Sequence, residues 1–219
     1  MLKIADQSWE KLTELKCTRN LIEELRPQVE SNANAALNSA YCFTKLIELE
    51  TNSSQRLADA KQGLKIAKSL AEQNQSNAVA QYLVALHTGY VAENDVLHGL
   101  SLVTEIELAA KNAAAIDPAI DSAGPERVLG ELYLQAPGPP VSIGDAEAAT
   151  SHFKRAVALA PLSIDNQLGL VEALIADDEL DAACLATHTL FNKFPQPAAQ
   201  KPAWEKGLKL LERLCKLQK

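Results

Sequence analysis

The chain has 219 residues, 47% of them hydrophobic, with 28 Asp and Glu against 21 Lys and Arg and a formal net charge of −7. This composition provides for a substantial core, and its acidic balance argues against a nucleic-acid-binding protein, which normally carries a basic surface. Apolar residues recur at helical spacing, and runs with the two-residue period of strands are scarce. We therefore predict an all-α protein.

The first half of the chain predicts a capping segment followed by alternating helices. Residues 1–28 have apolar side chains at helical spacing and a break near Pro27, so we predict one or two capping helices. Trp9 either makes a capping contact, which we favour, or forms a ligand platform. Helices over 29–49 and 76–92 carry few charges and should be sheltered on most sides. Helix 54–73 lies between them, with Ser53 or Ser54 as its N-cap.

The second half contains a ladder of small and large residues. Ala149, Phe153 and Ala156 lie four and three residues apart and so share one helix face, and Pro161 ends that helix. We expect Asp145 to be its N-cap. The ladder recurs as Ala183, Thr187 and Leu190 before Pro195, which follows Pro161 by 34 residues.

This order resembles the tetratricopeptide repeat, a helix–turn–helix unit of about 34 residues. The resemblance implies an α-solenoid of about ten helices, stacked as antiparallel pairs in a right-handed superhelix with terminal capping helices. We expect one domain over 1–219. Its parts are an N-terminal cap over 1–28, helix pairs over 29–195 and a C-terminal capping helix over 200–219.

Residues 116–174 resemble something narrower. Gly124-Pro125 suits the first turn of a helix, and a proline-rich turn over 135–144 follows. Together with Asn166, these features are similar to the T component (a helical-repeat protein) associated with tripartite ATP-independent periplasmic (TRAP) transporters. The resemblance implies binding to a solute-binding protein, a pore for a hydrophobic ligand and a periplasmic location. We see no signal peptide or membrane span, and on that ground alone we favour the cytoplasm.

The sequence shows no motif for catalysis, cofactor binding or a metal site. The four histidines lack metal-ligand spacing, and there is no phosphate-binding glycine loop or nucleophile elbow. Spaced carboxylates such as Asp117 and Glu126 support an enzyme only weakly. The cysteines, which are far apart, are interpreted as isolated buried thiols rather than a disulfide scaffold or a zinc site. They are Cys17, Cys42, Cys184 and Cys215.

We therefore predict a noncatalytic scaffold or adaptor that binds a partner domain or peptide segment on its concave face. The charge-poor helices would line this face, and the 135–144 turn would edge it. The alternative is a carrier of a small hydrophobic ligand in an inter-helix pore. Each candidate surface residue has a core alternative, which is favoured for the tyrosines, and for Arg127 we favour a structural ion pair over a partner contact. The candidates are Asn38, Tyr41, Tyr82, His87, Tyr90, Arg127, Tyr133 and Asn166.

Overall fold

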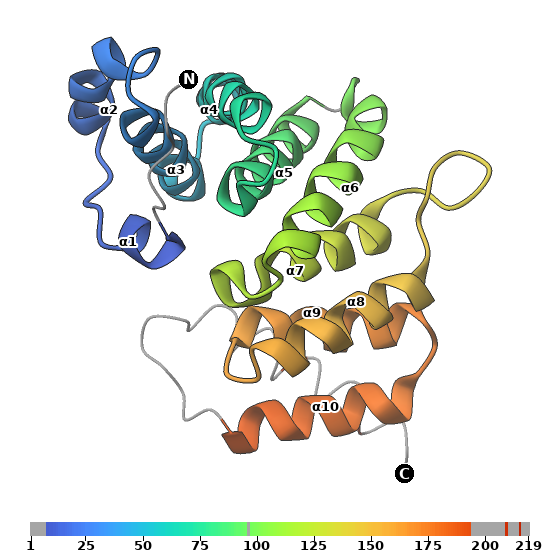
Figure 1. Ribbon diagram of the computed structural model, residues 1–219. Helices are drawn as coiled ribbons and strands as arrows, with labels where there is room; N and C mark the ends of the chain where they lie inside the picture. Colours follow the sequence, from blue (N-terminus) through green and yellow to red (C-terminus); the bar gives the residue numbers. More distant parts are fainter. Residues whose placement is uncertain (1–7, 96, 194–208, 210–214, 216–219) are drawn as a thin grey trace. The chain divides into compact units, whose positions relative to one another are not determined.

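The computed structural model describes residues 8–95, 97–193, 209 and 215, and the regular secondary structure of these residues is all helix, with no strand (Figure 1). The predicted all-α class is confirmed. The elements are α1 (Trp9–Thr13), α2 (Arg19–Leu25), a 3-10 helix η1 (Arg26–Gln28), α3 (Ala33–Leu49), α4 (Ser53–Gln73), α5 (Ala78–Asn94), α6 (Gly99–Ile116), α7 (Ile120–Gln135), α8 (Ala146–Leu159), α9 (Ile164–Ala176) and α10 (Leu180–Lys193).

The chain divides into two compact units, Met1–Asp121 and Ser122–Lys219, and each is described by itself. In the first unit each of α3, α4 and α5 packs against the next helix, and α2 packs against α3. In the second unit α8 packs against α9, and α9 against α10. The prediction of helices stacked as adjacent pairs is confirmed. A single domain and a right-handed superhelix over the whole chain stay predictions.

Helix starts are fixed mainly by short polar caps. Asp145 caps α8 as predicted, because its carboxylate accepts a hydrogen bond from the Ala148 N–H at 3.0 Å. The start of α4 differs by one residue from the prediction. Asn52, rather than Ser53 or Ser54, is the N-cap, and its side chain accepts from the Gln55 N–H at 3.1 Å.

Helix α7 begins with a left-handed turn that the sequence did not indicate. Asp121, Ser122 and Ala123 have φ angles of 50°, 54° and 67°. L-residues rarely adopt this region in succession, so surrounding contacts must hold the turn. Pro125 lies inside α7, two residues after the last left-handed residue, Ala123. The proline therefore stands in the first right-handed turn, where its missing N–H costs nothing.

The repeat ladder forms the core of the second unit. Phe153 is 1% exposed and packs with Ala149 and Ala173, which are fully buried. The small residues beside it let neighbouring helices approach closely. A Cβ on Gly130 would lie 2.7 Å from the Phe153 ring, so only glycine leaves room there.

The proline-rich turn between α7 and α8 is anchored by backbone hydrogen bonds. The Gly144 N–H donates to the Pro137 carbonyl at 2.9 Å, and the Asp145 N–H donates to the Tyr133 carbonyl at 2.9 Å. A Cβ on Gly144 would overlap the Ala136 carbonyl, which explains the glycine. The turn is therefore ordered, with Val141 exposed at 66%.

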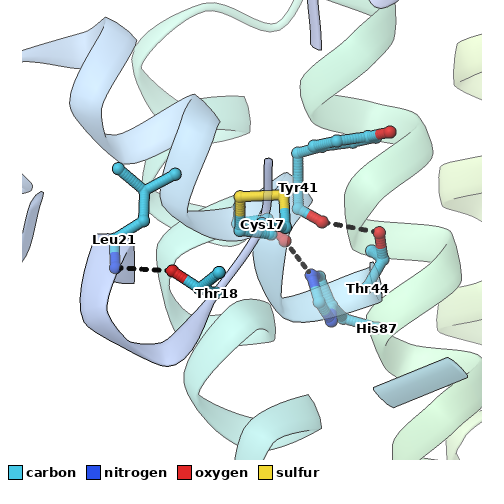
Figure 2. The surroundings of a disulfide bond; sticks show 8 residues. Cys17, Thr18, Leu21, Tyr41, Thr44 and His87 are labelled. Carbon is cyan, nitrogen blue, oxygen red and sulfur yellow. Dashed lines mark hydrogen bonds between the residues drawn. A yellow bond between two sulfur atoms is a disulfide. The ribbon is translucent and has the colours of Figure 1, made fainter. Parts of the chain in front are cut away.

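The four cysteines are paired, so their interpretation as isolated thiols was wrong. Cys17 bonds to Cys42 with a Cα–Cα distance of 4.9 Å, and Cys184 bonds to Cys215 with a Cα–Cα distance of 5.6 Å. The first disulfide ties the start of α2 to α3, beside the Thr18 hydroxyl that accepts from the Leu21 N–H (Figure 2). The paired cysteines are 25 and 31 residues apart in the sequence, so no local spacing indicated either disulfide.

Two predictions concern the chain ends and the membrane. The predicted C-terminal capping helix over 200–219 falls outside the described part of the chain, apart from Lys209 and Cys215. Among the described helices, none is both long and apolar enough to cross a bilayer.

Candidate functional site

The eight candidate surface residues all lie on alternating helices, namely α3, α5, α7 and α9. They differ in burial. Tyr82, His87 and Asn166 are 0% exposed and Tyr41 is 3% exposed, so these four support the fold from inside. The half-buried members reach the surface, and they are Asn38, Tyr90, Arg127 and Tyr133.

In the first unit three aromatic rings form a cluster under the N-terminal cap. The Trp9 ring lies 5.3 Å from Tyr41 and 5.2 Å from Tyr82, edge-on in both cases. The Tyr82 hydroxyl donates to an Asp121 carboxylate oxygen at 2.7 Å. Because Trp9 is only 7% exposed, it makes a capping contact and not an open ligand platform.

One stripe of α3 continues from this cluster to the surface. Asn38, Tyr41, Lys45 and Glu48 are spaced three, four and three residues apart, so they share a helix face. The Lys45 Nζ lies 2.9 Å from Glu48 and 5.7 Å from the centroid of the Tyr41 ring. The Tyr90 hydroxyl of α5 donates to Glu48 at 3.4 Å. We call Asn38, Lys45, Glu48 and Tyr90 the α3–α5 row.

The pKa values of Tyr41 and Lys45 are shifted by burial and by neighbouring charges. Burial raises the pKa of the Tyr41 hydroxyl. For Lys45, burial acts to lower the pKa, but the hydrogen bond and charge of Glu48 outweigh it, so the pKa is raised. The row therefore presents the Lys45–Glu48 ion pair with aromatic and amide groups next to it.

His87 of α5 forms a buried hydrogen bond to the backbone of α3 next to this stripe. Its Nε2 donates to the Ala40 carbonyl at 3.0 Å, one residue before Tyr41 on α3 (Figure 2). Since a carbonyl only accepts, Nδ1 carries the lone pair, and it is buried without a hydrogen-bond partner. Burial lowers the pKa of His87 to about 4, although the bond to Ala40 opposes this. His87 is neutral and joins α5 to α3.

In the second unit a buried carboxylate organises α7 and α8. Glu126 is 9% exposed, and its Oε2 lies 2.7 Å from His152 Nδ1 and accepts from Arg155 Nε at 2.9 Å. Tyr133 stacks on the His152 ring at 5.3 Å, with an interplanar angle of 13°. Burial acts to raise the pKa of Glu126, but the two hydrogen bonds outweigh it, and the pKa is lowered. A carboxylate held ionised in this way is a weak general base.

Arg127 is positioned by a buried amide. Its Nη1 donates to the Asn166 Oδ1 at 3.0 Å. The Asn166 amide nitrogen donates to the carbonyls of Ser122 at 2.7 Å and Ala156 at 3.2 Å, so it also holds the left-handed turn of α7. Arg127 and Asn166 were proposed separately from the sequence, and this hydrogen bond joins them.

Four polar residues of these sites were missed by sequence analysis. These four are Lys45, Glu48, His152 and Arg155. Their spacing could have indicated them, because Lys45 and Glu48 share a helix face with Tyr41. His152 and Arg155 likewise lie three residues apart on α8. From the sequence, Glu126 was considered only as one of the spaced carboxylates that weakly support an enzyme. Its contacts with His152 and Arg155 of α8 could be recognised only in the folded structure.

The first unit also contains a groove of about 670 Å³ between α2, η1, α3 and α4. Its apolar walls include Ile22, Phe43 and Ile66, and Arg26, Glu30 and Lys65 add charges. This volume lies within the range of small-molecule sites, about 300–1,000 Å³. None of the eight candidate residues lines this groove.

Comparison with known proteins bears on the fold alone. No protein-family model matches the sequence, and no curated protein gives a significant match. The structure is similar to the crystal structure of a thermophilic TPR protein from Thermus thermophilus, with a TM-score of 0.55 and 13% identity. The match covers 87% of this chain and 98% of that chain. The chain therefore has a TPR-like helical-repeat fold.

Proposed function

We propose that this protein is a noncatalytic TPR-like scaffold that binds a protein partner through the surface of its alternating helices. The observation that carries the proposal is the α3–α5 row in this fold. Helical-repeat proteins present extended surfaces made by equivalent helices of successive repeats. The row combines an ion pair, an amide and a tyrosine, which suit a polar peptide or domain surface.

The polar groups of the second unit support binding over catalysis. Glu126 is ionised and occupied by His152 and Arg155. Arg127 is held in place by Asn166 and is half-buried, so it can contribute to a partner contact with little loss of side-chain entropy. Arg127 and Tyr133 are therefore the proposed contact residues of the second unit.

The test is quantitative binding of a partner that is first captured from native cells and identified. Tyr90→Ala should weaken its affinity roughly 10-fold or more, because truncation of an interface aromatic commonly costs about 2 kcal/mol. Leu108→Ala is the matched control, since Leu108 is 61% exposed on α6, outside the alternating helices. Equal affinities of both variants and the wild type would contradict the proposal.

A second candidate function rests on the groove of the first unit. A small apolar molecule with an anionic group would fit its apolar walls, with Lys65 and Arg26 near the charge. Extraction of the purified protein and mass spectrometry should then find one such compound per chain. Ile66→Glu should abolish its retention and leave partner binding through the α3–α5 row unchanged.

The TRAP resemblance names a solute-binding protein as the specific partner and the periplasm as the compartment. Two disulfides support an oxidising compartment over the cytoplasm that we favoured from sequence, because cytosolic thiols are kept reduced. Alkylation of free thiols in intact cells before lysis tests this. Four blocked cysteines per chain would place the protein in a reducing compartment instead.

A further inference from the structure

A cluster of metal-ligating side chains surrounds one disulfide. Among the described residues, Cys184, His188 and Cys215 form the one group of three ligand-bearing side chains whose donor atoms all lie within 4.8 Å of one another. Cys184 and His188 are four residues apart on α10, so they share a helix face. Cys215 joins them from 31 residues along the chain and packs beside Val171 and Leu174.

The donor set suits zinc. Zn²⁺ binds thiolate sulfur at about 2.3 Å and imidazole nitrogen at about 2.0–2.1 Å, so the ligands of a tetrahedral site lie roughly 3.5–3.8 Å apart. The three donor atoms already lie within 4.8 Å of one another, and once the S–S bond is reduced the two sulfurs must move apart to reach this geometry. Two thiolates and an imidazole favour Zn²⁺ over hard cations such as Mg²⁺ and Ca²⁺.

We propose that Cys184, His188 and Cys215 form a zinc site when their disulfide is reduced. A thiol reductant supplies two electrons, is itself oxidised to a disulfide, and leaves the two cysteine sulfurs as thiols. Zn²⁺ then displaces two protons from these sulfurs and takes the His188 nitrogen as its third protein ligand. Water occupies the fourth position. The site thus exchanges a disulfide for a metal according to the redox state of its surroundings.

The other disulfide provides an internal comparison. Cys17 and Cys42 belong to no three-residue ligand group in the part of the chain that the structure describes. Cys42 is 0% exposed, and the nearby His87 already uses its Nε2 for the Ala40 carbonyl (Figure 2). His188, in contrast, is exposed on α10 and can turn toward an incoming ion. Reduction alone therefore creates one zinc site per chain, and not two.

The experiment is a zinc titration of the full chain under anaerobic conditions, with a phosphine as reductant and a chromophoric chelator as competitor. The reduced protein should bind one Zn²⁺, and the oxidised protein none. Co²⁺ should give thiolate charge-transfer absorption in the near ultraviolet. His188→Gln should weaken zinc binding by about 10-fold or more, which is the loss seen even for outer partners of a metal site. Cys215→Ser should abolish stoichiometric binding.

Matched variants separate a site from adventitious binding. His98→Gln, at another exposed histidine, and Cys17→Ser should each keep one Zn²⁺ at wild-type affinity. Far-ultraviolet circular dichroism verifies that every variant is folded, and His188→Gln should fold normally because its side chain is exposed. The proposal is overturned if the reduced wild type binds no zinc, or if His188→Gln and Cys215→Ser bind it like the wild type.

Discussion

Gly169 of α9 leaves the space that the Phe153 ring of α8 occupies, because a Cβ on Gly169 would overlap ring atoms of Phe153. Gly169→Ala should therefore destabilise the protein by about 1–3 kcal/mol, the usual cost of overpacking a core. Helix propensity alone predicts the opposite sign, a gain of up to about 1 kcal/mol. Urea denaturation measures the difference.

Gly89 provides the matched control for that substitution. It also lies in a helix, but a Cβ there would meet nothing within 4 Å. Gly89→Ala should stabilise the protein by about 0.5–1 kcal/mol. If both alanine variants shifted the unfolding midpoint in the same direction, close packing against Phe153 would not be the cause.

Phe153→Ala should cost about 3–5 kcal/mol, as deep aromatic truncations do. The ring is 1% exposed and packs with Ala149, Ala173 and partly buried Tyr133. The measurement is the unfolding free energy by denaturant titration. In the double variant with Gly169→Ala, the alanine methyl fills part of the cavity, so the combined loss should be smaller than the sum. Strict additivity would argue against direct contact.

The core ladder was predictable because its signal is local. Ala149, Phe153 and Ala156 share one face by spacing alone, and that face is buried in the structure. The cap at Asp145 was predictable for the same reason. The one-residue difference at Asn52 arises because three polar residues in a row can each act as an N-cap.

Contacts that join distant segments could not be read from the sequence. Trp9 packs against Tyr41 and Tyr82 from more than thirty positions away, and both tyrosines lie in the core, the alternative that was favoured for them. The cysteine pairs have the same origin. The left-handed turn at Ser122 depends on Asn166, which donates to its carbonyl from α9. Local propensity contains none of this information.

His87 should make stability depend on pH. Its pKa is about 4 in the folded protein against a usual value of 6.5, because burial disfavours the imidazolium. The unfolded chain therefore binds more protons between these values, and stability falls as the pH falls through this window. The loss should approach about 3 kcal/mol near pH 4. Chemical denaturation at a series of pH values measures it.

A His87→Gln variant isolates this effect from other titrations. Its amide N–H can keep the bond to the Ala40 carbonyl without gaining a proton. The variant should lose the wild type's additional slope between pH 6.5 and 4. Identical pH profiles for the two proteins would show that His87 is not a neutral buried residue.

Glu126→Gln should destabilise the second unit by about 1–3 kcal/mol, because it removes the charge that His152 and Arg155 share. In the wild type, Glu126 contributes its stability above the usual pKa of 4.5 and loses it as the pH falls through its lowered folded pKa. Thermal unfolding at pH 7 compares the variants. Glu147→Gln, at an exposed position on α8, should change stability far less.

The Cys17–Cys42 disulfide closes a loop with a sequence separation of 25 residues, and its removal should cost about 3 kcal/mol. The reason is that the crosslink restricts the unfolded chain and ties α2 to α3 in the folded one. Cys17→Ala/Cys42→Ala leaves Cys184–Cys215 intact, so its melting temperature under oxidising conditions isolates the first disulfide. A phosphine reductant should lower the melting temperature of the wild type at least as much. If the double variant melted with the oxidised wild type, the crosslink would have no stabilising role in the first unit.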